Sequence, residues 1–109
     1  MSIELEPRVL LQVQDVLRQH VPECEIWAFG SRVGRGAKRF SDLDLAIVSA
    51  TPVATRRLAL LASAFEESDL PIKVDVVDLH STSAAFRQRI AAHHEVICRP
   101  IESRQPESI

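Results

Sequence analysis

Two aspartates stand one residue apart at the start of DLDLAIVS, residues 42–49. This stretch alternates and then becomes continuously apolar, which is typical of a largely buried β-strand. Successive side chains on a strand point to opposite faces, so Asp42 and Asp44 project from the same face. The opposite face is apolar and consists of Leu43, Leu45 and Ile47. The chain must therefore bury one side of this strand while the other side presents two like charges.

The apolar periodicity predicts helices and strands in the order α-β-β-α-β-α. The first helix is expected from Pro7 to His20, because apolar residues recur there at helical spacing. The second is expected from Thr51, as cap, to about Glu67, with Pro52 in its first turn. The third is expected to end near His93, and Ser81 and Ser83 are alternative caps for it.

Strands are predicted on both sides of these helices. The expected strands are CEIWAF at 24–29, the DLDLAIVS stretch, the β-branched IKVDVVDL at 72–79 and a short edge strand, EVIC, at 95–98. Residues 32–40 are polar, basic and rich in glycine, so they are expected to form a loop. Trp27 and Phe29 are interpreted as core residues. The fold class predicted is α+β, a small mixed sheet packed against helices on one face.

The totals indicate one domain, residues 1–109, with a flexible tail from about residue 100. A net charge of -2 and a pI near 6.1 argue against a dedicated nucleic-acid binder. Cys24 and Cys98 are interpreted as reduced, packed thiols. No apolar run approaches the ~18 residues of a membrane span, and the N-terminus does not resemble a signal peptide, so a cytoplasmic protein is predicted.

Paired carboxylates beside a glycine-containing loop indicate a site for metal-bound phosphate. Two acids on one face disfavour each other's charged form, and a divalent cation removes that conflict. Mg²⁺ prefers a few carboxylates together with water and substrate phosphate oxygens. Gly30 allows the backbone to approach a phosphate closely, and the Ser31 hydroxyl can donate to it. Arg32 and the basic residues that follow it add positive charge nearby.

Each of these features has a simpler interpretation when taken alone. Ser41 and Asp42 favour turns for local hydrogen-bonding reasons, so SDLDL could be an ordinary strand entry. The basic loop could be a solvated surface. The linked pattern is more restrictive: a strand, Gly30-Ser31, ten intervening residues (32–41) and then Asp-x-Asp at the start of a second strand.

This linked pattern resembles the signature of the DNA polymerase beta-like nucleotidyltransferase superfamily. The short chain, and GSRVGRGAKRFSDLDLAIV in particular, is similar to its smallest branch, the minimal nucleotidyltransferase (MNT) domains. The resemblance covers roughly residues 27–79. It implies the polymerase beta-like core fold and an enzyme that transfers a nucleotide.

The resemblance also implies a third carboxylate on a nearby strand, for which Asp75 and Asp78 compete. These acids are three residues apart and therefore point to opposite faces of a strand. Val74 and Val76 are expected to face the core, which leaves Asp75 on the face shared with Asp42 and Asp44. The face argument thus favours Asp75 and keeps Asp78 as the alternative.

In the mechanism that the resemblance implies, Asp42 and Asp44 bind two Mg²⁺ ions that hold the triphosphate of a nucleotide. Asp75 joins them at the second metal and helps to deprotonate an attacking hydroxyl. Gly30, Ser31 and Arg32 hold the phosphates. The resemblance makes ATP the expected substrate and AMP the group transferred.

Two functions from different classes follow from the resemblance. MNT domains are commonly paired with a helical HEPN-type protein, and characterised ones act as antitoxins that transfer AMP to a tyrosine of that partner. This chain contains no tyrosine, so such a target lies elsewhere. The alternative is a non-catalytic subunit that neutralises or completes a HEPN-like partner. The retained acids favour the enzyme. An antibiotic-modifying transferase is less favoured, because such enzymes usually need an acceptor domain. The sequence leaves homo-oligomerisation, the nucleotide and the acceptor open.

Overall fold

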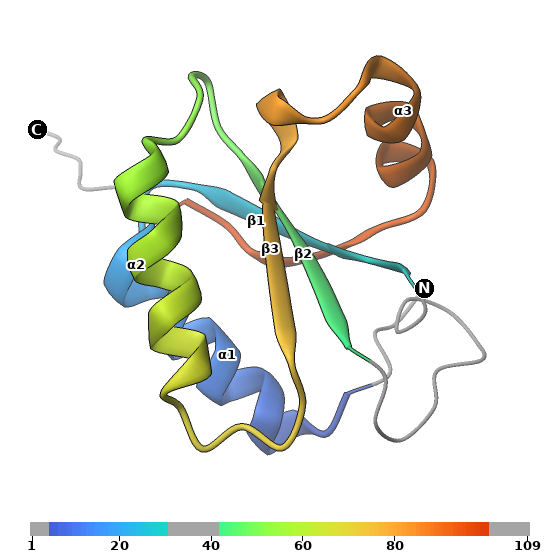
Figure 1. Cartoon of the computed structure of the whole chain (residues 1–109). Coiled ribbons are helices and arrows are strands. Elements are labelled where there is room, and N and C mark those ends of the chain that lie inside the picture. Colours follow the sequence, from blue (N-terminus) through green and yellow to red (C-terminus); the bar gives the residue numbers. More distant parts are fainter. Residues whose placement is uncertain (1–4, 31–41, 101–109) are drawn as a thin grey trace, which may run out of the picture.

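The computed structural model describes residues 5–30 and 42–100 of the chain (Figure 1). The helices are α1 (Pro7–His20), α2 (Thr55–Glu66) and α3 (Ala84–Ala92), with a 3₁₀ turn, η2 (Leu79–Ser81), before α3. The strands are β1 (Glu25–Phe29), β2 (Leu43–Val48), β3 (Val74–Asp78) and β4 (Glu95–Cys98). The predicted order of elements is confirmed, including the short last strand.

The strands form one mixed sheet in the order β3-β2-β1-β4. Strand β1 runs antiparallel to both of its neighbours, whereas β2 and β3 are parallel and are connected through α2. Strand β4 lies at the edge, as expected. The α+β class predicted from the sequence is therefore confirmed.

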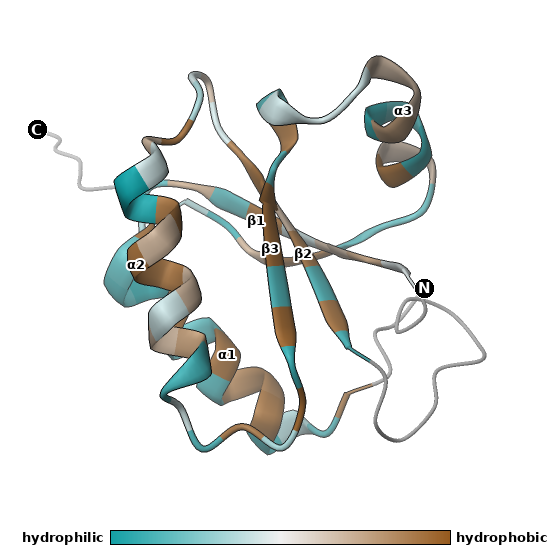
Figure 2. Ribbon diagram, viewed as in Figure 1, coloured by the Kyte–Doolittle hydropathy of each residue, from teal (hydrophilic) through white to brown (hydrophobic). Residues whose placement is uncertain are grey.

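Helices α1 and α2 cover one face of the sheet and form the main core with it (Figure 1). Polar and apolar residues alternate over the first three residues of β2 and of β3, which is visible in Figure 2. The apolar side of β2 is completely buried and consists of Leu43, Leu45 and Ile47. Helix α1 contributes residues spaced four apart, namely Val9, Val13 and Leu17. Cys24 and Cys98 are free thiols in this core, and burial raises the pKa of both.

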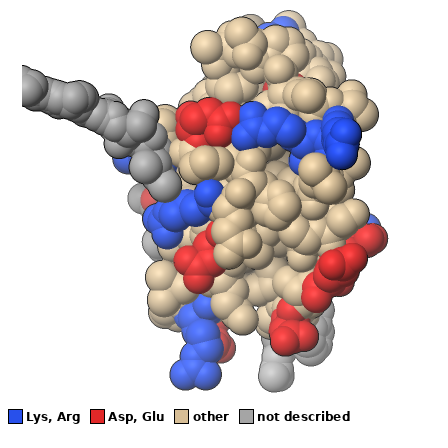
Figure 3. All heavy atoms as spheres, turned by 90° about the vertical axis from the view of Figure 1, so that its left-hand side faces the viewer, with Lys and Arg blue, Asp and Glu red and all other residues tan. Residues whose placement is uncertain are grey.

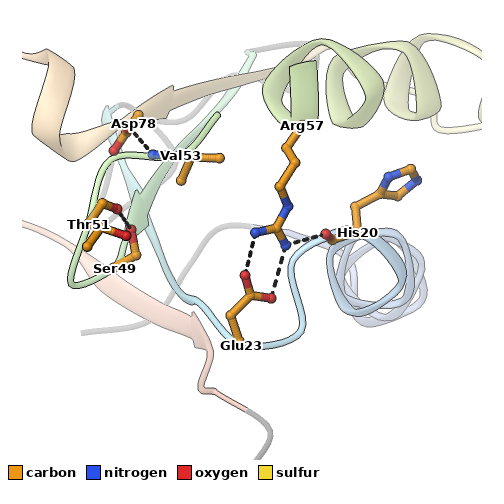
Figure 4. A network of polar contacts seen from close by, with 7 residues as sticks. All are labelled: His20, Glu23, Ser49, Thr51, Val53, Arg57 and Asp78. Carbon is orange, nitrogen blue, oxygen red and sulfur yellow. Dashed lines mark hydrogen bonds and ion pairs between the residues drawn. The ribbon is translucent and has the colours of Figure 1, made fainter. Parts of the chain in front are cut away.

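Helix α2 begins at Thr55, so the prediction of a start at Thr51-Pro52 is wrong. The reason is a tertiary hydrogen bond that local propensity does not reveal. The Val53 amide donates to Oδ2 of Asp78, at 2.8 Å, and this bond ties the segment before the helix, in which Ala54 is extended, to the end of β3 (Figure 4). A side chain at the end of β3 therefore helps to hold the extended segment that precedes α2.

Asp78 is buried, with 3% of its surface exposed, and its carboxylate accepts two backbone hydrogen bonds. Its second oxygen accepts from the His80 amide at 3.0 Å, in the turn that follows β3. Asp78 pairs in register with Ile47, so it lies on the core side of the sheet. It is therefore a structural acid, turned away from the face that carries Asp44.

We expect Asp78→Ala to lower the free energy of unfolding by about 3 kcal/mol, because it leaves two backbone amides without their charged acceptor. Urea denaturation followed by circular dichroism measures this change. Asp69→Ala, at an exposed position, is the matched control and should change stability by less than about 0.5 kcal/mol. Equal stability of the two variants would contradict the structural role of Asp78.

Arg57 joins the start of α2 to the connection between α1 and β1 (Figure 4). Its guanidinium donates to both carboxylate oxygens of Glu23 and, at 2.8 Å, to the His20 carbonyl. The hydrogen bond from Arg57 lowers the pKa of Glu23.

On the side of the molecule shown in Figure 3, acidic and basic side chains are interspersed. No helix in the described part of the chain is long and apolar enough to cross a membrane.

Helix α3 lies against the opposite face of the sheet from α1 and α2, so the predicted packing of helices on one face holds for α1 and α2 but is wrong for α3. It is capped by Ser83, whose hydroxyl accepts from the Phe86 amide at 3.1 Å. Trp27 and Phe29 belong to this face and are half-buried. The prediction that they are residues of the main core is therefore wrong. The period-two geometry of β1 gives the core side to Ile26 and Ala28 instead.

Candidate active site

The two acids predicted to share a face, Asp44 and Asp75, are direct neighbours in the sheet. They are in register on the parallel strands β2 and β3, and both are half-buried. In-register residues of adjacent strands project from the same face, so the two carboxylates lie side by side. Val74 and Val76 pack against the core on the other face, as the sequence predicted.

Asp42 is exposed and lies immediately before β2. It is close enough to Asp44 to act on it electrostatically. Within residues 5–30 and 42–100, no group of three acidic, histidine or cysteine residues is close enough together to hold a metal ion. The structure thus brings Asp44 and Asp75 together and leaves Asp42 at the margin of the pair.

Burial is the main cause that raises the pKa of Asp44, and the negative charges of Asp75 and Asp42 raise it further. Among the described residues, Asp75 has one cationic neighbour, Lys73, whose Nζ lies 3.8 Å from Oδ1 of Asp75. Both side chains of that ion pair are substantially exposed, so the pair is weak. The negative charge on Asp44 therefore has little compensation within the described protein.

Gly30 closes the site from the end of β1. Its φ of 85° is in the left-handed region that glycine adopts without strain. A Cβ at this position would lie 2.6 Å from Oδ2 of Asp44, which is closer than real contacts allow. The glycine therefore serves two purposes, because it permits the turn and makes room for the carboxylate. Ser31 and Arg32, the other predicted phosphate-binding residues, lie outside the described residues.

A cavity of about 680 Å³ extends from Gly30 and Asp44 toward α3. Its sheet side is formed by Phe29, Gly30, Asp44 and Val77, and its helix side by Phe86, Arg89, Ile90, Ala92 and His93. The volume is within the range of small-molecule sites, and the lining is mostly apolar with a few polar groups, as in such sites. Asp44 thus lines a cavity that is large enough for a ligand of nucleotide size.

The residues of α3 were not identified as site residues from the sequence. Their only signal is spacing: Phe86 and Ile90, and likewise Arg89 and His93, are four residues apart and so share one side of a helix. Two adjacent histidines, His93 and His94, follow α3, where a role at the helix C-terminus is expected. His94 fulfils this role, because its Nδ1 lies 2.9 Å from the Ala91 carbonyl, whereas His93 also lines the cavity. His80 contacts the Ser49 carbonyl instead of the acids.

A mixed sheet with two adjacent acids beside a glycine turn and a ligand-sized cavity fits the class of nucleotidyltransferases expected from the sequence. The family model described as polymerase beta, nucleotidyltransferase matches residues 12–102. The chain therefore belongs to the polymerase beta nucleotidyltransferase family, as one of its minimal domains.

Similar proteins agree with this assignment. A Haemophilus influenzae protein named probable protein adenylyltransferase MntA is 44% identical over 96 residues, which are 88% of this chain and 84% of the relative. A toxin-antitoxin crystal structure with AMP-PNP is 27% identical and has a TM-score of 0.68, with 87% of this chain and 74% of that chain covered. A structure of a tri-AMPylated Shewanella oneidensis HEPN toxin in complex with an MNT antitoxin is 25% identical and has a TM-score of 0.66. The match covers 87% of this chain and 73% of that chain.

Proposed function

We propose that this chain is an Mg²⁺-dependent nucleotidyltransferase that moves AMP from ATP to a hydroxyl of a HEPN-type partner protein, as the antitoxin-like half of a two-component module in the cytoplasm. The observation that supports it most strongly is the in-register pair Asp44 and Asp75 with Gly30 directly against the first carboxylate. The relative named as a protein adenylyltransferase supports AMP as the group transferred. The HEPN toxin complex supports the class of partner.

The donor set of this site suits Mg²⁺. The ion prefers oxygen ligands and uses one or two carboxylates together with phosphate oxygens of the substrate. Asp44 and Asp75 supply such oxygens. Burial, and then the negative charges of Asp75 and Asp42, raise the pKa of Asp44, and a bound cation would favour its charged form. We assign the adjacent acids Asp44 and Asp75 to the metal, with Asp42, at the margin of this pair, as a third ligand that must move toward the ion. Bound Mg²⁺ would stabilise the charge that develops on the entering and leaving oxygens.

The reaction is an in-line displacement at the α-phosphate. The acceptor oxygen forms a bond to the α-phosphorus, the bond from that phosphorus to the bridging oxygen of the β-phosphate breaks, and pyrophosphate leaves. Asp75 accepts the proton of the acceptor hydroxyl. Gly30, Ser31 and Arg32 hold the β- and γ-phosphates, since a glycine allows close backbone approach and the other two donate hydrogen bonds.

The second candidate function is a non-catalytic subunit that binds a HEPN-like partner and neutralises it. The toxin-antitoxin complexes among the structural relatives favour a binding role, which the enzyme would also have. The two differ in chemistry, because only the enzyme needs two adjacent acids to hold a metal ion.

We expect Asp75→Asn to slow AMP transfer by at least about 100-fold, the usual contribution of a positioned proton acceptor. Pyrophosphate release in the presence of the co-purified partner measures the rate. Asp78→Asn is the control on the same strand, because it faces the core and keeps one of the two oxygens that accept backbone hydrogen bonds, so its effect is on folding and not on the chemistry. Equal losses in the two variants, each normalised to folded protein, would contradict the assignment of Asp75.

A further inference from the structure

The cavity beside Asp44 has a second wall whose chemistry differs from that of the acids. This wall is the side of α3 that faces the sheet, and it combines an aromatic ring with two polar groups, Phe86, Arg89 and His93. Spacing of three and four residues puts these side chains on one side of the helix. The wall therefore offers an apolar surface and hydrogen-bond donors to one ligand.

Contacts with the sheet fix the position of α3. The rings of Phe86 and Phe29 meet edge to face, with centroids 5.7 Å apart and an interplanar angle of 83°. Ile90, one turn further along, is 2% exposed. Arg89 and His93 are exposed, so their polar ends remain available to a ligand in the cavity.

We propose that this wall is the nucleoside subsite of the enzyme, in which Phe86 contacts the base and Arg89 donates hydrogen bonds to the base or the ribose. The inference rests on the proposed function, because the cavity begins at Asp44, which is assigned to the metal-bound triphosphate. Aromatic side chains are common surfaces for nucleobases. An arginine supplies five donors in a planar group that also stacks on rings.

The lining favours the nucleoside over the acceptor as the occupant. Gly30 and Asp44, which are assigned to the phosphates and their metal, both line the cavity. Asp75, which is assigned to the acceptor hydroxyl, is not among its described lining residues. The volume of about 680 Å³ also exceeds what one acceptor side chain needs and is typical of sites for whole small molecules.

Calorimetric titration of two probes separates the nucleoside from the phosphates. ATP with Mg²⁺ carries both parts, whereas inorganic tripolyphosphate with Mg²⁺ carries only the phosphates. We expect Arg89→Ala to raise the Kd of ATP about tenfold, which is the usual effect of losing a charged hydrogen bond, and to leave the Kd of tripolyphosphate unchanged. Phe86→Leu should raise the Kd of ATP by a similar factor, because it removes the ring and keeps the apolar volume.

Arg87→Ala is the matched control, because Arg87 is an exposed arginine of the same helix and does not line the cavity. It should leave both Kd values unchanged, and thermal denaturation verifies that all variants fold. Unchanged ATP binding in Arg89→Ala, or equal weakening of both probes, would overturn the nucleoside subsite. If wild type binds neither probe, the proposed function fails and the subsite fails with it. If wild type binds both, and only Asp44→Asn weakens them, the proposed function stands and the subsite fails.

Discussion

Asp44→Asn should lower the rate of AMP transfer by at least about 1,000-fold while leaving the protein as stable as wild type or more stable. The loss of activity follows because an amide cannot supply the charge that holds the metal, and metal stabilisation of the transition state is worth several kcal/mol. The stability follows from the environment of Asp44, where burial and the charges of Asp75 and Asp42 raise its pKa and so disfavour the carboxylate.

The pH dependence of stability gives a second measure of the same residue. Because the folded-state pKa of Asp44 is raised, its contribution to stability is fully present below the ordinary aspartate value of about 3.9 and is lost as pH rises through the folded-state pKa. In Asp44→Asn the side chain does not titrate, so the variant does not lose this stability as pH rises. The difference in unfolding free energy between Asp44→Asn and wild type, measured without metal, should therefore increase in favour of the variant from acid to neutral pH.

Asp69→Asn serves as the control for both measurements, because Asp69 is exposed and lies in the connection between α2 and β3. It should retain wild-type activity and wild-type pH dependence. A variant Asp44→Asn that transfers AMP at the wild-type rate would exclude Asp44 from the metal site. Lower stability of that variant at neutral pH would show that the carboxylate is stabilised by contacts other than those described.

Gly30→Ala should be the most damaging single change at the site for the fold. An alanine at φ 85° costs about 1–2 kcal/mol in backbone strain. Its Cβ would also meet Oδ2 of Asp44 at 2.6 Å, so the carboxylate must move. We expect a loss of about 2–4 kcal/mol in unfolding free energy and at least about tenfold weaker binding of ATP with Mg²⁺. Urea denaturation and calorimetry measure the two effects.

The background of Asp44→Ala separates the two causes, because that change removes the carboxylate that the new Cβ would meet. In this background Gly30→Ala should cost only the backbone strain, about 1–2 kcal/mol. The double-mutant cycle reports the difference as a coupling energy between the two positions. An equal cost of Gly30→Ala in both backgrounds would show that the close approach to Asp44 contributes nothing to stability.

The shared face of the acids was predictable because it depends on one property of a strand, the alternation of side chains. That property put Asp42 and Asp44 on one face, and with the core-facing valines it favoured Asp75 over Asp78 in position. The burial of Asp78 and its register with Ile47 agree with that choice. The catalytic roles of these acids stay predictions.

Features that depend on contacts between distant segments were not predictable from local pattern. The extended segment before α2 is bonded to Asp78, which is 25 residues from Val53 in sequence. The cavity depends on where α3 packs, and Arg89 has no local feature that distinguishes it from the control position Arg87. Trp27 was assigned to the core because large aromatic residues usually lie there, but it stacks on His94 with ring centroids 3.8 Å apart, on the half-buried face.

The central claim is that this chain transfers AMP to a hydroxyl of the protein that it binds. Its most direct test is mass spectrometry of the co-purified partner after incubation with ATP and Mg²⁺, with wild type and Asp44→Asn compared in parallel. We expect the partner to gain the mass of AMP on a tyrosine, serine or threonine with wild type and not with the variant, and pyrophosphate to be released in equal amount. A stable complex in which the partner stays unmodified and no pyrophosphate appears would contradict the claim and leave the non-catalytic binding subunit as the function.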